Sequence, residues 1–271
     1  HGRAVTLVAE TGGLNAMVVD SSALAEQVVV DALRSAFDSA GQRCSALRVL
    51  CVQEDVADRV LEMLLGAMAE LRVGGPERLA IDVGPVIDAE AKSHLVQHIE
   101  TMRAAGRRVH SLCAPGALPH DGHFVLPTLI ELSDLAELDR EVFGPVLHFV
   151  RYRREALDDL IEAIHRAGYG LTMGLHTRID ETIAHVRERS RVGNLYVNRD
   201  MIGAVVGVQP FGGEGLSGTG PKAGGPLYLY RLLSRRPDEL PALALAAPDG
   251  APCPDRAAPP ALQALMHWAR E

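Results

Sequence analysis

A single cysteine, Cys44, is the residue of this chain best suited to act as a nucleophile. It lies in the segment 41–45 (GQRCS), between a predicted helix and an apolar stretch, so we expect a polar turn rather than a core position. The thiolate is the reactive form of cysteine, and a nearby cation favours it. Arg43 could be that cation or could equally be a surface charge, and the sequence leaves both interpretations open.

A carboxylate upstream of Cys44 supplies the second half of a catalytic pair. Glu10 follows the apolar residues 5–8 (VTLV) and precedes Thr11 and two glycines. A carboxylate can act as a general base, and glycines leave room for a ligand against the backbone. The sequence therefore predicts a sulfur nucleophile and a base that act together.

Composition and charge narrow the class of protein. The chain has 271 residues, of which 47% are hydrophobic, so one large domain or two small ones can form a sizeable core. The formal net charge of -8 argues against a nucleic-acid surface in this region. No apolar run approaches the roughly 18 residues that a membrane-spanning helix needs.

Cysteine and histidine usage predicts a cytoplasmic protein without a metal site. The cysteines are Cys44, Cys51, Cys113 and Cys253. They form no CxxC pair, which favours reduced thiols over disulfides or zinc. His94 and His98 lie four residues apart on a predicted helix without a third ligand, so a solvated or partly packed face is the preferred interpretation. The first residues lack the features of a signal peptide and an initiator Met, so we expect a piece of a longer polypeptide.

Apolar periodicity predicts an alternation of strands and helices. Strands are expected over 5–9, 15–19, 47–52, 124–130, 146–150 and 195–198, with another around Val109. Helices are expected over 22–39, 55–72, 89–105, 155–167 and 180–191, the first capped by Ser22 and closed by Gly41. This order predicts an α/β fold with a mainly parallel sheet flanked by helices. Ligands in such sheets gather at the carboxyl ends of strands, which is where we expect Glu10, Cys44 and Asn198.

A glycine-rich segment late in the chain matches a nucleotide-binding pattern only superficially. Residues 213–218 (GEGLSG) fit G-x-G-x-x-G, a pattern that should open a helix. The next residues, 219–226 (TGPKAGGP), cannot form a regular helix. We therefore predict a long glycine-rich loop that packs close to another backbone or a ligand.

The composition changes at about residue 236. The stretch that follows is dense in Ala and Pro, which predicts a weakly ordered linker. A helix over 260–270 is expected to start a further element. The chain is thus divided into a first domain over 1–235 and a tail over 236–271.

Two aromatic residues allow alternative interpretations. In the segment 141–146 (EVFGPV), Phe143 could be buried where a strand begins. Alternatively, Glu141 could chelate sugar hydroxyls while the Phe143 ring packs against a flat heterocycle. Phe211 begins the glycine-rich loop, where an aromatic ring is either part of the core or the wall of a substrate site.

Taken together and in this order, the motifs around Glu10, Cys44, Glu141 and Phe211 resemble the aldehyde dehydrogenase superfamily. The finer strings over 9–24 and 211–229 resemble the L-glutamate γ-semialdehyde (1-pyrroline-5-carboxylate) dehydrogenase module of bifunctional bacterial proline-catabolic enzymes. The resemblance covers residues 5–234. It implies that 1–235 is an aldehyde dehydrogenase catalytic domain.

The resemblance implies a mechanism and a cofactor, NAD+. Cys44 would attack the aldehyde carbon to form a thiohemiacetal, and loss of hydride to NAD+ would give a thioester. Glu10 would activate the water that hydrolyses it. Glu141 would hold the nicotinamide ribose, and Phe143 would pack near the nicotinamide.

The resemblance also implies a substrate site for L-glutamate γ-semialdehyde. Ser45 and the backbone of Gly203 and Ala204 would anchor the α-carboxylate, and Phe211 would cover the aliphatic part. Small residues at 203–204 expose backbone N–H groups, which suits an anion-binding nest.

Other parts of the implied enzyme are expected upstream of His1. These are most of the cofactor site, an Asn of the oxyanion hole and a proline dehydrogenase domain with FAD, so we expect this chain alone to be inactive. A homo-oligomer in the bacterial cytoplasm is also expected. The alternatives are another aldehyde substrate, a Cys hydrolase that pairs Cys44 with a His, and a non-catalytic assembly module.

Overall fold

A seven-stranded sheet forms the centre of the computed structural model, which describes residues 7–112 and 121–232. The chain divides into two units, residues 1–228 and 229–271, and the sheet and the candidate site belong to the first. The expected tail over 236–271, its helix over 260–270, Cys113 and Cys253 lie outside the described residues.

The sheet is parallel apart from one edge strand. Its order is β3-β4-β5-β2-β1-β7-β8, and only the pair β3–β4 is antiparallel. The strands are β1 (Ala16–Val19), β2 (Val49–Gln53), β3 (Arg108–Ser111), β4 (Thr128–Leu132), β5 (Val146–Tyr152), β7 (Thr172–His176) and β8 (Asn194–Val197). A small antiparallel pair joins β6 (Tyr169–Gly170) to β9 (Glu214–Gly215).

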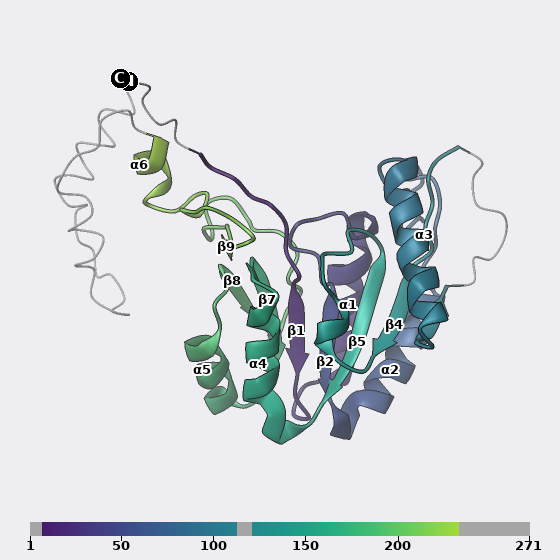
Figure 1. Cartoon of the computed structure of the whole chain (residues 1–271), viewed down its shortest axis with the longest axis horizontal. Helices are drawn as coiled ribbons and strands as arrows, with labels where there is room; N and C mark the ends of the chain where they lie inside the picture. The colour runs from purple at the N-terminus through teal and green to yellow at the C-terminus, as the bar shows by residue number, and fades with distance from the viewer. Residues whose placement is uncertain (1–6, 113–120, 233–271) are drawn as a thin grey trace. The chain divides into compact units, whose positions relative to one another are not determined.

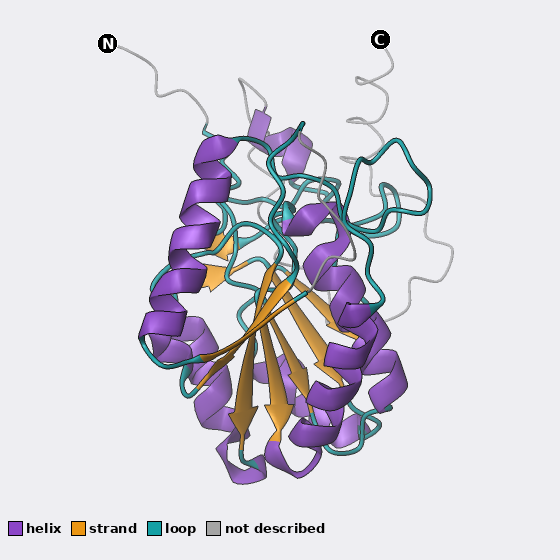
Figure 2. Cartoon of the chain, turned by 90° about the vertical axis from the view of Figure 1, so that its right-hand side faces the viewer, coloured by secondary structure: helices purple, strands orange, loops and turns teal. Residues whose placement is uncertain are grey.

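Helices cover both faces of this sheet (Figure 2). The covering helices are α1 (Ala25–Phe37), α2 (Glu54–Ala69), α3 (Ala89–Ala104), α4 (Leu157–Arg166) and α5 (Asp180–Arg189). A short helix, α6 (Tyr228–Leu232), follows later in the chain. Every residue of β1, β2, β4 and β7 is buried. Continuous burial without alternation is what a parallel sheet covered on both faces requires, so the predicted α/β fold is confirmed.

One predicted strand is absent, and one observed strand was not predicted. Residues 7–9 are not in a strand, and Glu10 forms only an isolated bridge with Gly218. This segment pairs with the glycine-rich loop, through Thr11 N–H to the carbonyl of Ser217 at 3.0 Å, instead of joining the sheet. The strand β7, by contrast, was not predicted.

The first helix starts later and ends earlier than the sequence suggested. Ser22 does not cap it, because its hydroxyl bonds to Asp20 at 2.6 Å, and α1 begins at Ala25. After Phe37 the chain enters a short turn, η1 (Asp38–Gly41), in which Ser39 and Ala40 have positive φ. Gly41 also has positive φ, and a Cβ there would lie 2.2 Å from the Gly144 carbonyl oxygen. A larger residue is therefore excluded where the chain turns towards Cys44.

The expectation that Glu10 and Cys44 lie at the carboxyl ends of strands was wrong, whereas the same expectation for Asn198 is confirmed. Glu10 precedes β1, Cys44 precedes β2 and Glu141 precedes β5, so all three lie on segments that lead into strands. Asn198 follows β8, and its side chain bonds to Thr177 after β7. The candidate catalytic residues thus lie where the parallel strands begin, which we call the amino edge of the sheet. Asn198 lies where the strands end, at the carboxyl edge. In Figure 1 the strand β1 points downward, and the glycine-rich loop around β9 lies beyond its upper, amino end.

Candidate functional site

Cys44 lies between η1 and β2 with an exposed side chain. Partial desolvation raises the pKa of its thiol, and the carboxylates of Glu141 and Glu10 raise it further. The backbone N–H groups of Ser45 and of Cys44 itself act in the opposite direction. The thiol is accordingly accessible but needs a proton acceptor or added positive charge to become a thiolate.

Arg43 is not the cation that faces this thiol. Its side chain is exposed, and its Nε donates to Ser39 Oγ at 3.0 Å. The cation that interacts with Cys44 is Arg48, at the start of β2. Of the two interpretations left open for Arg43, the surface charge fits the structure.

Arg48 is a fully buried cation that the sequence analysis did not single out. Its Nη2 and Nε donate to Glu141 Oε1 at 2.8 and 3.1 Å. Its Nη1 donates to the Gly41 carbonyl at 2.6 Å, and its Nη2 also donates to the Arg43 carbonyl at 3.0 Å. Arg48 thus ties Glu141 to the loop that carries Cys44. A charged residue within an otherwise apolar run was the signal available in the sequence.

Glu141 and Phe143 line a small cavity on this edge. The second carboxylate oxygen of Glu141, Oε2, accepts a hydrogen bond from Gly13 N–H at 3.1 Å. Phe143 is 45% exposed, and the Arg48 guanidinium lies 5.0 Å from its ring centroid. A cavity of about 230 Å³ lies against both residues, with His94 and His98 on its wall. The interpretation of Phe143 as a buried residue is therefore wrong.

Glu10 is exposed and lies against the glycine-rich loop. Gly213 N–H points to Glu10 Oε2 at 3.5 Å. A Cβ added at Gly212 or Gly218 would lie within 3.3 or 3.0 Å of the Glu10 carboxylate oxygens. The Glu10 carboxylate therefore lies in close contact with these two positions, a spacing that favours glycine there. The loop packs against another backbone segment, as predicted.

The proposed substrate-binding residues are partly brought together. Ser45 is buried, and its Oγ accepts a hydrogen bond from Gly203 N–H at 2.8 Å. Gly203 has a φ of +69°, and Ala204 follows it. Phe211 is half-buried, and its backbone pairs with Ala223 at 2.9 and 2.8 Å. The structure therefore joins Ser45 to the 203–204 turn and anchors Phe211 at the start of the glycine-rich loop.

His98 bonds to a buried histidine, His148, at 2.9 Å between the two Nε2 atoms. Nδ1 of His148 lies 3.0 Å from the carbonyl oxygen of Arg48, so Nδ1 is the donor. His98 must then donate to His148 Nε2. Burial lowers the pKa of His148 to about 3, so it is neutral. Among the residues that the structure describes, no group of three or more His, Cys, Asp and Glu side chains could hold a metal ion.

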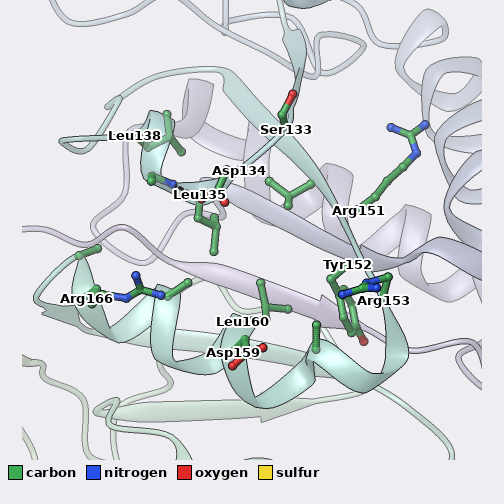
Figure 3. Close-up of a pocket in the computed structure, with 15 residues that line it drawn as sticks. Ser133, Asp134, Leu135, Leu138, Arg151, Tyr152, Arg153, Asp159, Leu160 and Arg166 are labelled. Carbon is green, nitrogen blue, oxygen red and sulfur yellow. Dashed lines mark hydrogen bonds between the residues drawn. The ribbon is translucent and has the colours of Figure 1, made fainter.

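A cavity larger than the one beside Phe143 lies at the opposite, carboxyl edge of the sheet. It has a volume of about 600 Å³ and is lined by the carboxyl end of β5, by α4 and by residues 133–138. Figure 3 shows Leu135 and Leu160 in its wall, with Arg166 near one end. None of the candidate catalytic residues contributes to it.

The amino edge therefore combines an exposed thiol, an exposed carboxylate and an acidic side chain beside an exposed aromatic ring. Such a set can form a covalent bond to an electrophilic carbon and then activate water. Two buried polar side chains that the sequence analysis did not single out, Arg48 and Asn15, connect the segments that carry this set.

A mainly parallel sheet covered by helices, with an exposed cysteine at its amino edge, matches the architecture of the aldehyde dehydrogenases. The sequence model of the aldehyde dehydrogenase family matches residues 1–235, and the chain belongs to that family.

Among its relatives, the chain is 66% identical over 253 residues to the bifunctional protein PutA of Escherichia coli, covering 92% of this chain and 19% of that protein. It is 38% identical over 225 residues to the 1-pyrroline-5-carboxylate dehydrogenase of Geobacillus kaustophilus, covering 82% of this chain and 43% of that protein. A crystal structure of bifunctional proline utilization A is similar with a TM-score of 0.80 and 59% identity, over 85% of this chain and 23% of that one. The chain thus spans about a fifth of the length of its bifunctional relatives.

Within the described residues, every helix is too short or too polar to cross a lipid bilayer.

Proposed function

We propose that this chain carries the nucleophile and base of an enzyme that oxidises L-glutamate γ-semialdehyde to L-glutamate with NAD+. The observation that carries the proposal is the exposed Cys44 thiol, whose pKa responds to both Glu141 and Glu10. The thiol therefore lies close enough to both carboxylates to interact electrostatically with each of them. The names of the similar proteins, PutA and 1-pyrroline-5-carboxylate dehydrogenase, support the choice of substrate.

In the proposed reaction, Cys44 Sγ adds to the aldehyde carbon as its proton leaves, which gives a thiohemiacetal. NAD+, when bound, supplies the acceptor for the hydride of that carbon. The hydroxyl proton of the thiohemiacetal passes to solvent, and Cys44 is left as a thioester. Glu10 then takes a proton from water, whose oxygen adds to the thioester carbon and releases L-glutamate and the thiol. The Glu10 side chain is exposed, so water can reach its carboxylate.

The residues at the amino edge suit the nicotinamide-ribose end of this cofactor. Glu141 offers carboxylate oxygens for ribose hydroxyls, and the exposed ring of Phe143 offers a flat apolar surface. The cavity of about 230 Å³ lies against both. Arg48 holds Glu141 in place, because its guanidinium donates twice to one carboxylate oxygen.

The substrate carboxylate has a smaller set of donors than the resemblance implied. Gly203 N–H is already bonded to Ser45 Oγ. The Ser45 hydroxyl hydrogen and the Ala204 N–H are the donors proposed for the carboxylate, with Phe211 beside the aliphatic chain. This nest would favour an acidic aldehyde over a neutral one.

Alkylation of the isolated chain tests the nucleophile. We expect iodoacetamide to modify Cys44 well before Cys51, which is fully buried and whose pKa burial raises to about 12. L-Glutamate, the product of the proposed reaction, should slow modification of Cys44 only. Equal inertness of both thiols, measured by peptide mass spectrometry, would contradict the proposal and favour an assembly module.

The proposal also covers the longer polypeptide of which this chain would be a part. A polypeptide that also carries an upstream cofactor half and a proline dehydrogenase domain with FAD should couple proline oxidation to NAD+ reduction, as a homo-oligomer in the bacterial cytoplasm. This chain alone should not reduce NAD+. The hydrolase alternative needs a histidine against Cys44, whereas the charged groups that interact with the thiol are Glu141, Glu10 and Arg48.

A further inference from the structure

The side chain of Asn15 connects three segments at the amino edge. It lies directly before β1 and is only 2% exposed. Its Nδ2 donates to the carbonyl oxygens of Cys44 and Ala46 at 2.7 and 2.9 Å. Its Oδ1 accepts a hydrogen bond from Thr172 N–H, at the start of β7, at 3.2 Å. Both hydrogens of this amide are thus committed to the loop that carries the nucleophile.

The bond to the Cys44 carbonyl fixes one particular peptide plane. The carbonyl of Cys44 and the N–H of Ser45 belong to the same planar unit and point in opposite directions. Because Asn15 holds the oxygen on one side, the Ser45 N–H is held on the other side, and its interaction with the Cys44 thiol lowers the pKa of that thiol. A donor on a carbonyl also polarises the N–H of the same peptide and strengthens it.

We propose that Asn15 is a positioning residue that controls the reactivity of Cys44 by orienting the Cys44–Ser45 peptide towards the sulfur. The inference rests on the proposed function of Cys44 as nucleophile. It goes beyond that function because it assigns the tuning of the thiol to a buried amide that touches neither substrate nor cofactor.

The charges around the sulfur explain why the orientation of the Cys44–Ser45 peptide matters for the thiol. Glu141 and Glu10 face the thiol and oppose its ionisation, while Arg48 is the cation that favours it. Arg48 is already neutralised by Glu141 at 2.8 Å. The backbone N–H groups of Cys44 and Ser45 are therefore the remaining partial positive charges that can stabilise the thiolate.

The test is the pKa of Cys44 in Asn15→Ala, read from the 13C shift of its labelled Cβ and from alkylation between pH 6 and 10.5. Loss of the anchor should raise that pKa by about one unit, which lowers the alkylation rate at pH 7 about tenfold. Asn15→Asp keeps the volume but cannot donate when ionised, so it should shift the pKa in the same direction. An unchanged pKa in a folded variant, with or without a change in rate, would overturn the inference.

Asn198→Ala is the matched control. It removes two hydrogen bonds of the same kind, to the backbone of Thr177 at the opposite edge. It should lower stability without changing the pKa of Cys44. An equal shift in this control would mean that general loosening, not orientation, alters the thiol, and would refute the role of Asn15.

The unsubstituted protein offers a second measurement if the variants do not fold. The side-chain NH2 resonances of Asn15 should titrate with the same midpoint as Cys44, because one peptide unit links them. Resonances that stay constant through that titration would overturn the inference. If Cys44 of the unsubstituted chain resists alkylation altogether, the proposed function fails instead, so the two failures are distinguishable.

Discussion

The two edges of the sheet carry polar clusters of opposite character. At the carboxyl edge, Asp20 accepts from Ser22 N–H and Oγ at 2.8 and 2.6 Å and from the Thr177 hydroxyl. Asn198 closes this cluster by exchanging two bonds with the Thr177 backbone, so its members satisfy one another. At the amino edge, buried Arg48 and Asn15 are saturated, but Cys44 and Glu10 stay exposed. Polar residues at a strand end indicate a reactive site only when some of them remain unsaturated.

Among changes that would test this difference between the two edges, the loss of Arg48 is expected to have the largest effect. Arg48→Met should lower the free energy of unfolding by about 3–5 kcal/mol, because it leaves the Glu141 carboxylate and the carbonyls of Gly41 and Arg43 without their donor. Chemical denaturation followed by circular dichroism measures this loss.

An exposed ion pair supplies the control for Arg48. Arg59 contacts Glu26 at 3.3 Å with side chains 69% and 58% exposed, and Arg59→Met should change the free energy of unfolding by less than about 1 kcal/mol. If the two substitutions have similar effects, Arg48 does not organise the amino edge.

A smaller effect concerns pH and the carboxyl edge. His176, at the end of β7, is buried, and burial lowers its pKa to about 4. Its Nε2 lies 3.5 Å from Asp31 Oδ2, and burial raises the pKa of Asp31, so both groups favour their neutral forms. As the pH falls from about 6.5 to about 4, the unfolded chain gains a proton that folded His176 does not, which should remove up to about 3 kcal/mol of stability.

Urea denaturation between pH 7 and pH 4 tests this dependence. His176→Gln should flatten the fall in unfolding free energy over that window. His148→Gln should do the same over a window that extends to about pH 3, because the pKa of His148 is lowered to about 3. The exposed His123 is the control, and its replacement by Gln should leave the slope unchanged. A slope that neither buried substitution alters would contradict the assignment of neutral histidines.

Local patterns predicted much of the fold but not its finer contacts. The strands at 16–19 and 49–53 and the helices at 54–69 and 89–104 follow from uninterrupted apolar periodicity. The strand β7 was missed because Thr172 and Gly174 interrupt its apolar run and no turn residue marks its end. Gly174 is required there by tertiary packing, since a Cβ would lie 3.0 Å from Met17 of the neighbouring strand.

The candidate site was predictable to the extent that its residues are polar and lie in turns. Cys44, Glu10 and Glu141 stand out for that reason, and their position beside strand ends could be inferred. Their edge could not, because the carboxyl-end rule describes loops that leave strands. Asn15 and Arg48 act through partners 29 and 93 residues away, and a single sequence contains no record of such pairs.

The smallest expected effect is on the alkylation rate of Cys44, and it separates two roles of Glu10, as a nearby charge and as a base. Glu10→Gln removes a negative charge that raises the pKa of Cys44, so alkylation of Cys44 at pH 7 should become about two- to fivefold faster. The same change should slow aldehyde oxidation by about 10²–10⁴-fold in a polypeptide that includes the cofactor half, because it removes the base. Asp20→Asn, at the carboxyl edge, removes an equal charge and should alter neither rate. If Glu10→Gln speeds alkylation and slows oxidation while Asp20→Asn changes neither rate, the chemistry lies at the amino edge. If Glu10→Gln lowers both rates, Glu10 only supports the glycine-rich loop.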